Sequence, residues 1–276
     1  MFPKEKNGLL GDSTKGPIGN GDEKSPLPMY TTATASSSQT PFQTQFASLS
    51  MHMEDRLRFL QFPNEIVNIA RECIRANWSR GIQDERMYAG SKEIKLYGNP
   101  WRGSGDQAVE ARRLICKILG CLHEQGWVLS LATDISKKTS DKDTLLFRHQ
   151  VPSPASCDWL AIGFSKSDRI KFIDAPSTIP TFLTSRLAGR VQDSCQHHMR
   201  GVWEIKLAGS PWWAEGTETM RVRELLLTLL SVLEGEGWTV YASVDQKNGG
   251  EKYTETDTWH CCRPRGWVRG APVYHG

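Results

Sequence analysis

The chain carries one short segment twice, EIKLYGNPWR beginning at Glu93 and EIKLAGSPWW beginning at Glu204. A shift of 111 residues aligns positions 93–134 with positions 204–245 without a gap, and 15 of the 42 aligned residues are identical. Identity at one fixed spacing indicates a duplicated folding unit. We therefore expect an α+β fold made by tandem duplication, with two repeats related by an approximate twofold axis.

The spacing of apolar residues predicts the elements of each unit. EIKL alternates charged and apolar residues, which is typical of a short strand, and the Gly and Pro that follow end it. Residues 104–125 place apolar side chains three and four apart, which predicts a long amphipathic helix. A strand hairpin follows in each copy, and the first copy adds a second hairpin over residues 158–175. The predicted unit is helix, strand, helix and antiparallel strands, and we favour sheets that join edge to edge.

The beginning of the chain differs in composition from the rest. It is dominated by Gly, Ser, Thr, Pro and Gln without a helical or strand period, which predicts a disordered N-terminal tail over residues 1–53. MEDRLRFLQF and NEIVNIARECIRANW then space their apolar residues as helices do. We accordingly place the first repeat at residues 54–175 and the second repeat at residues 176–276.

Composition limits the class of protein. The net charge is only +3 and its basic residues are interspersed with acidic ones, so we expect no DNA partner. No segment approaches the roughly 18 apolar residues that cross a bilayer, so we expect no transmembrane segment. The seven cysteines are odd in number and irregular in spacing, which favours reduced thiols in the cytoplasm or the nucleus over a disulfide framework.

Charged residues that both copies keep are the first candidates for a binding site. In each copy a Glu and a Lys lie two residues apart on one face of the predicted strand, and an Arg follows on the helix. Ordinary ion pairing is the simpler interpretation, and a pocket or contact surface for a ligand or partner is the alternative. The six residues are Glu93, Lys95 and Arg112 in the first copy, and Glu204, Lys206 and Arg223 in the second.

The spacing of the residues that usually bind metals or act as nucleophiles gives little support for either kind of site. Asp143 and its repeat Asp257 flank a loop and could hold a divalent cation, but Asp is also frequent at the ends of turns. No CxxC pair, Walker loop, GxSxG or HExxH stands in a suitable context. We expect no resident metal and no cofactor, and we favour a protein without enzymatic activity. The thiol and imidazole groups considered for zinc are Cys195, His197, His198, His260, Cys261 and Cys262.

The ten tryptophans are the compositional outlier. Trp213 follows Trp212 directly, and adjacent rings cannot both lie in one core, so we expect one of the pair to be exposed and to anchor a partner. The first copy has Arg102 where the second has Trp213. We therefore expect the two copies to differ in surface function at this position.

Four functional hypotheses follow from these observations. We favour a non-catalytic intracellular protein-interaction or scaffold protein whose duplicated domain binds another protein. The alternative is a carrier or sensor of an apolar small ligand or lipid, because a curved sheet covered by a long helix can enclose a cavity. An enzyme with a cleft between the repeats comes third. RNA binding through aromatic residues on a sheet comes fourth, because no RNP-type sequence is present.

Overall fold

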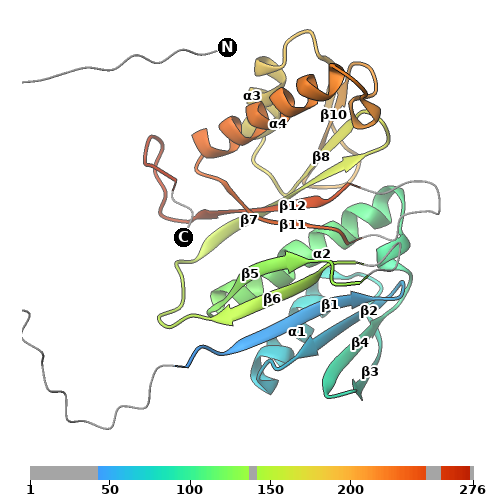
Figure 1. The fold of residues 1–276 in the computed structure, drawn as a ribbon, viewed down its shortest axis with the longest axis vertical. Helices are drawn as coiled ribbons and strands as arrows, with labels where there is room; N and C mark the ends of the chain where they lie inside the picture. The colour runs from blue at the N-terminus through green and yellow to red at the C-terminus, as the bar shows by residue number, and fades with distance from the viewer. Residues whose placement is uncertain (1–42, 137–141, 247–255, 274–276) are drawn as a thin grey trace, which may run out of the picture. The chain divides into compact units, whose positions relative to one another are not determined.

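The computed structural model describes residues 43–136, 142–246 and 256–273. In these residues the chain forms two antiparallel sheets of six strands each, with helices packed against them (Figure 1). The α+β class is therefore confirmed. The disorder predicted for residues 1–42 lies outside the described part of the chain. None of the helices in that part is long and apolar enough to cross a membrane.

The two copies have the same order of elements, including one short 3-10 helix each. The elements of the first copy are β1 (Phe46–His52), β2 (Arg56–Leu60), α1 (Asn64–Asn77), β3 (Ile82–Tyr88), β4 (Ser91–Leu96), η1 (Pro100–Arg102), α2 (Gly105–Glu124), β5 (Trp127–Thr133) and β6 (Thr144–His149). Those of the second are β7 (Cys157–Ser165), β8 (Arg169–Ile173), α3 (Thr178–Arg186), β9 (Val191–Gln196), β10 (Val202–Leu207), η2 (Pro211–Trp213), α4 (Glu218–Gly235), β11 (Thr239–Val244) and β12 (Thr258–Pro264). Because each element has a counterpart, the predicted tandem duplication is confirmed.

Strand pairing places the start of the second copy earlier than the sequence predicts. The strand orders are β3-β4-β2-β1-β6-β5 in the first sheet and β11-β12-β7-β8-β10-β9 in the second. The hairpin of β7 and β8, predicted as part of the first repeat, pairs with β12 and β10 and so belongs to the second sheet. The predicted boundary between residues 175 and 176 is therefore wrong, and the second copy begins near Cys157.

The predicted disordered tail is wrong for its last residues. Residues 46–52 form β1, which pairs with β2 on one side and with β6 on the other. Ala47, Leu49 and Met51 alternate with polar neighbours, as a half-buried strand requires, and all three are buried in the core. The Ser-rich and Thr-rich sequence before this segment concealed its alternation from an interpretation based on composition.

The segment MEDRLRFLQF also differs from its prediction, because residues 56–60 form the strand β2 and not a helix. Leu57 and Phe59 alternate with polar side chains and are buried, while the apolar spacing of three and four was incidental. The next prediction is confirmed, because α1 begins at Asn64 directly after Pro63.

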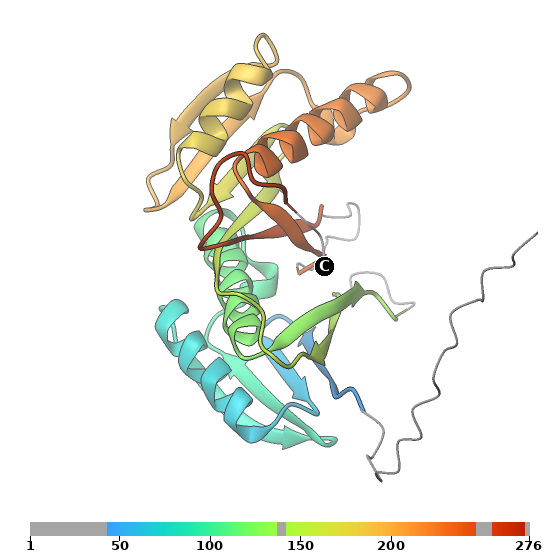
Figure 2. The same cartoon turned by 90° about the vertical axis from the view of Figure 1, so that its left-hand side faces the viewer.

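The long helix α2 is buried on two sides. One side packs on its own sheet and contributes Leu114, Ile118 and Leu122 to the core of the first copy. The opposite side packs on β7 and β8, where Val109 and Cys116 are buried against the second sheet. Figure 2 shows α2 between the strands of the two sheets. The main contacts of its counterpart α4 are with α3, β11 and η2. The predicted twofold axis would require α4 to pack on the first sheet as α2 packs on the second, and in the described part of the chain α4 makes no comparable contact.

The two sheets stay separate, so the predicted edge-to-edge joining is wrong. The edge strands β5 and β11 do lie close together. The backbone N–H of Leu129 donates to the hydroxyl of Tyr241 at 2.6 Å, and the N–H of Asp143 donates to the carbonyl of Asp245 at 3.0 Å. Because a side-chain hydroxyl takes a place that a ladder bond would occupy, the two edges meet without forming one continuous sheet.

Candidate functional site

The repeated decapeptide closes one corner of each sheet by the same contacts. After the strand a glycine with a positive φ angle turns the chain, and a 3-10 helix begins at the proline. The indole N–H of Trp101 then donates to the carbonyl oxygen of Arg56 at 3.1 Å, and that of Trp212 donates to Arg169 at 3.2 Å. Both copies have therefore kept the same turn and the same tryptophan hydrogen bond in this segment.

Glu93 on β4 is the centre of an ion-pair network on the face of the first sheet opposite α2. Its side chain is 1% exposed and accepts hydrogen bonds from Arg56, Arg58 and Arg86 at 2.5, 2.7 and 2.8 Å. Burial raises the pKa of this carboxyl, but the three guanidinium groups outweigh it and hold the pKa at about 2. Three cations around one buried acid favour a structural ion pair.

The matching acid of the second copy, Glu204 on β10, has two cations rather than three. It lies 2.7 Å from Arg169 and 3.4 Å from Lys171, and its side chain is 15% exposed. Lys95 and Lys206 are half-buried on the same strand faces as the two acids, as the alternation predicts. Neither acid is therefore poised as an open ligand-binding group.

The two conserved arginines lie away from these acids. Arg112 is buried between α2 and the second sheet, where its Nε donates to the Thr258 hydroxyl at 3.0 Å. The cavity beside Arg112 has a volume of about 10 Å³, which is room for one water molecule. Arg223 is exposed on α4 and donates to the carbonyl of Thr219 one turn earlier. The predicted grouping of Glu, Lys and Arg is therefore not assembled in either copy.

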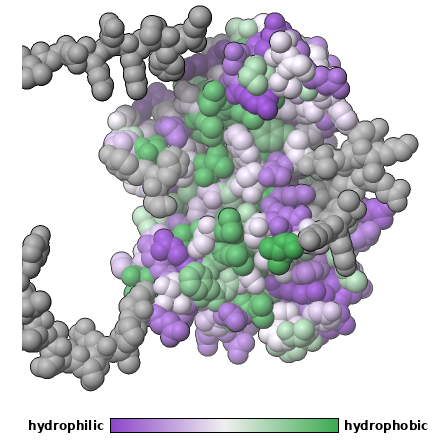
Figure 3. All heavy atoms as spheres, in the orientation of Figure 1, coloured by the Kyte–Doolittle hydropathy of each residue, from purple (hydrophilic) through white to green (hydrophobic). Residues whose placement is uncertain are grey.

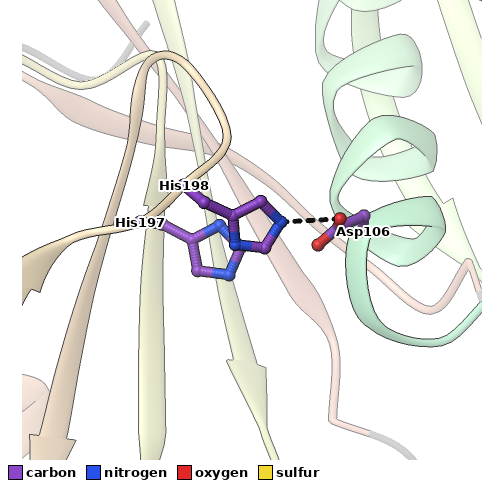
Figure 4. Close-up of side chains that lie close together, drawn as sticks. All are labelled: Asp106, His197 and His198. Carbon is purple, nitrogen blue, oxygen red and sulfur yellow. Dashed lines mark hydrogen bonds and ion pairs between the residues drawn. The ribbon is translucent and has the colours of Figure 1, made fainter.

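Two of the histidines considered for zinc meet an acid that the sequence did not single out. Ligand-type atoms of Asp106, His197 and His198 lie within 4.8 Å of one another, and Nε2 of His198 is 2.7 Å from a carboxylate oxygen of Asp106 (Figure 4). His197 accepts the N–H of Met199 on Nδ1, and its Nε2 is 3.4 Å from the ammonium of Lys171. Burial and this neighbouring lysine lower the pKa of His197. An ammonium group so close opposes a second cation, so this cluster is best described as a contact between α2 and the β9–β10 turn.

The remaining zinc candidates do not converge with them. His260 is buried below α2, and burial followed by the nearby Arg112 lowers its pKa to about 3, which keeps the imidazole neutral. Cys261 packs in the core of the second copy, and Cys262 is buried on the same strand. Cys195 is exposed on β9. These side chains point to different faces of the sheet, as alternation along a strand dictates.

The Asp residues beside the hairpin loops accept hydrogen bonds from other residues of the chain. Asp143 accepts the N–H of Asp245 at 2.9 Å, and Asp257 accepts the hydroxyl of Ser243 at 2.8 Å. Burial raises the pKa of Asp143, with its hydrogen bond from Asp245 acting in the opposite direction. Neither contact is the local side-chain-to-backbone bond of a turn, and the bond of Asp143 instead joins the two copies.

Trp213 is the predicted site residue that does line a groove. Its neighbour Trp212 is half-buried against Phe164, whereas Trp213 is 57% exposed, because consecutive residues of a 3-10 helix point in different directions. The groove beside it has a volume of about 650 Å³. Its apolar lining includes Leu207, Pro211 and Val222, and its charged lining includes Arg190, Glu215 and Glu218. None of the six conserved charged residues lines it.

The first copy fills the equivalent space with side chains. A Cβ atom placed on Gly98 would lie 2.7 Å from the guanidinium of Arg80 and 3.3 Å from the amide of Gln107, whereas one placed on the matching Gly209 would meet nothing within 4 Å. Strand register aligns Arg80 with Gly189, which has no side chain to cover the turn. Of these two equivalent corners, only the one in the second copy therefore has the groove.

Sequence reasoning missed the residues that create this difference. The exchange of Arg80 for Gly189 lies outside the gapless alignment, because the β3–β4 hairpin is two residues shorter than the β9–β10 hairpin: Ile82 pairs with Leu96, 14 residues later, and Val191 pairs with Leu207, 16 residues later. A search for large-to-Gly exchanges between structurally aligned copies would have found it. Asp106 was missed because its histidine partners lie 91 and 92 residues later in the chain, and nothing in the local pattern links them.

Comparison with known proteins agrees with this division. One protein-family model matches the chain twice, over residues 45–148 and 158–262, and the family is described by its domain with no activity attached. The first match spans β1 to β6 and the second spans β7 to β12 apart from their terminal residues. No curated protein and no solved structure matches the chain significantly.

Proposed function

The chain belongs to the family whose domain it carries twice, and from this premise we propose that it is a non-catalytic protein-interaction or scaffold protein. Its partner-binding site is the Trp213 groove on the second copy. The partner is a protein that inserts an extended segment with an apolar side chain beside Trp213.

This proposal rests on one observation: the first copy covers this corner with side chains, whereas the second copy exposes the equivalent corner. The first copy covers its corner with Arg80 and Gln107 and has the exposed Arg102, paired with Glu54 at 2.8 Å. The second copy uncovers the corner at Gly189 and adds a large exposed ring. Exposed tryptophans at the edge of a groove are frequent energetic anchors of protein interfaces.

The chemistry of the groove favours a peptide over a free apolar ligand. Charges of both signs line the groove beside an apolar floor that includes Leu225, and two of them, Arg221 and Glu218, lie 3.1 Å apart as an ion pair. A carrier of lipids needs an enclosed and mainly apolar cavity, so this alternative is less well supported. The seven cysteines are free thiols, which supports a reducing compartment such as the cytoplasm or the nucleus.

The test is selection of peptides from a random display library against the full chain, followed by affinity measurement with Trp213→Arg. This substitution installs the residue that the first copy has at the same position. We expect the selected peptides to lose about thirtyfold in affinity, the equivalent of a hot spot of about 2 kcal/mol.

Val268→Arg is the matched control, because Val268 is 69% exposed and lies outside the groove. We expect it to leave peptide affinity within about twofold of the original chain. Peptides that bind the Trp213→Arg chain as tightly as the original, or a selection that enriches no peptide, would contradict the proposed function.

A further inference from the structure

The helices α2 and α4 differ in what covers their outer sides. The α2 outer face (Val109, Arg112, Cys116 and Gly120) is buried against the second sheet. A Cβ atom on Gly120 would lie 3.0 Å from the ring of Trp159, which shows how closely helix and sheet approach. The repeat of 111 residues aligns these positions with the α4 outer face (Met220, Arg223, Leu227 and Ser231), whose residues are all exposed. Met220 is 55% exposed and Leu227 is 65% exposed.

The first sheet has the complementary surface. Strand register places Leu60, Ser48, Leu146 and Leu131 in one row across β2, β1, β6 and β5, which we call the open row. Its three leucines are 40%, 36% and 52% exposed in that order. The same register in the second sheet gives the buried row Ile173, Ala161, His260 and Ala242, of which the first three lie on the side that faces α2. In Figure 3 apolar residues lie over α4 and over β5 and β6.

From these matched surfaces we propose that a second copy of this chain docks its open row on the α4 outer face. Met220 and Leu227 then take the places of Val109 and Cys116, and the leucines of the open row take the places of Ile173 and His260. The contact between copies repeats the contact already made inside each chain. Its two surfaces are different, so association is head to tail and gives a ring if the rotation closes or an open helix if it does not.

Charge supports a matched pair of surfaces. Inside the chain, the cations Arg113 and Lys117 on α2 lie 2.9 and 3.2 Å from the carboxylate of Asp174. At the position of Arg113, α4 has Glu224, which would repel an aspartate. At the position of Asp174 the first sheet has Gln61, which is neutral and can hydrogen-bond to a glutamate. The residues on both sides of the proposed contact therefore differ from their counterparts in the internal contact, and the two replacements can hydrogen-bond to each other.

This inference is independent of the Trp213 groove. The groove takes Glu218, Arg221 and Leu225 from α4, and these residues lie on another side of the helix from Met220 and Leu227. A protein can therefore lose peptide binding while it keeps self-association, or the reverse.

Sedimentation equilibrium of the full chain tests the proposal, from about 1 to about 100 µM so that a micromolar Kd is bracketed. We expect the average mass of the original chain to rise with concentration beyond that of a dimer. Leu227→Glu disables the α4 outer face and Leu146→Glu disables the open row, and both sites are exposed enough for the fold to persist. Each variant alone should associate at least about tenfold more weakly.

Mixing the two variants is the decisive step. The Leu227→Glu chain still has an intact open row and the Leu146→Glu chain an intact α4 outer face, so one interface is restored. We expect an equimolar mixture to form a 1:1 dimer that does not grow further, while the control Val268→Glu associates like the original chain. A chain that stays monomeric, a mixture that stays monomeric, or equal weakening by Val268→Glu would overturn the proposal. A monomer in which Leu227→Cys resists thiol labelling would mean that another segment, such as residues 1–42, covers this face, and would also overturn it.

Discussion

The helices α2 and α4 occupy equivalent positions in two copies of one domain, yet 12 of the 20 residues of α2 are buried and only 4 of the 18 residues of α4. Both helices place a leucine-rich side on their own sheet. Part of the difference comes from the second sheet, which covers the outer side of α2, and part from α1, which packs more extensively on α2 than the shorter α3 packs on α4. Burial at equivalent positions is therefore decided by which neighbour each copy has, and not by the repeated pattern itself.

The corners closed by the decapeptides show the same division on a smaller scale. Trp101 is fully buried and Trp212 is half-buried, although both indoles donate to the same backbone position on β2 or β8. The conserved hydrogen bond is thus compatible with two degrees of packing. The first copy buries the corner in its core, and the second leaves it partly exposed beside the Trp213 groove.

The largest expected effect compares these two tryptophans. Trp101→Ala should lower the free energy of unfolding by about 3 to 5 kcal/mol, because it empties a fully enclosed site. Trp212→Ala should cost about half as much, because part of that ring already faces solvent. Urea unfolding followed by circular dichroism measures both. Equal costs would show that the two corners are packed alike, and would remove the basis of the comparison.

A smaller effect separates the two acids. Glu93→Gln should destabilise the chain by about 3 kcal/mol at pH 7, because it leaves three arginines around a neutral group. Glu204→Gln should cost only about 1 kcal/mol, since this carboxylate has two cationic partners rather than three and is itself 15% exposed. Urea unfolding at pH 7 gives both values, and a larger cost at Glu204 would contradict the assignment of the network.

The cost of Glu93→Gln in the free energy of unfolding should depend on pH, and the direction follows from the pKa of Glu93. The pKa of Glu93 is lowered from 4.5 to about 2, so its stabilising contribution is present above pH 4.5 and is lost as the pH falls towards 2. The cost of Glu93→Gln should therefore shrink between pH 7 and pH 3. A cost that stays constant over this range would mean that the carboxylate is not stabilised by its arginines.

Much of the fold could be predicted from the sequence, because the two copies are most alike in segments whose structure follows from the local order of apolar and polar residues. The strand of EIKL, the long helix and the duplication follow from patterns within 42 aligned residues. The strands β1 and β2 of the first copy, the boundary near Cys157 and the one-directional contact of α2 could not be predicted. They depend on pairing between distant segments, such as β1 with β6, which no local period encodes.

The candidate site could be predicted only at Trp213. A doubled tryptophan in a turn makes one exposed ring a geometric necessity, and the structure places that ring beside a groove. The conserved charges failed as a guide because Glu93 and Glu204 are conserved for their ion pairs with β2 and β8. The residue that opens the groove, Gly189, is recognised only when its counterpart Arg80 is identified by strand register.

The central claim, that one copy covers the outer side of its helix and the other exposes it, is tested most directly by thiol labelling. Cys116 on α2 is 3% exposed, and the Leu227→Cys substitution puts a thiol at the equivalent position of α4, where the leucine is 65% exposed. Labelling of the dilute full chain, with peptide mass spectrometry to resolve the two sites, gives both rates in one sample. We predict that position 227 reacts as a free surface thiol while Cys116 reacts only when the chain unfolds. Similar rates at the two positions in the native protein would contradict the account.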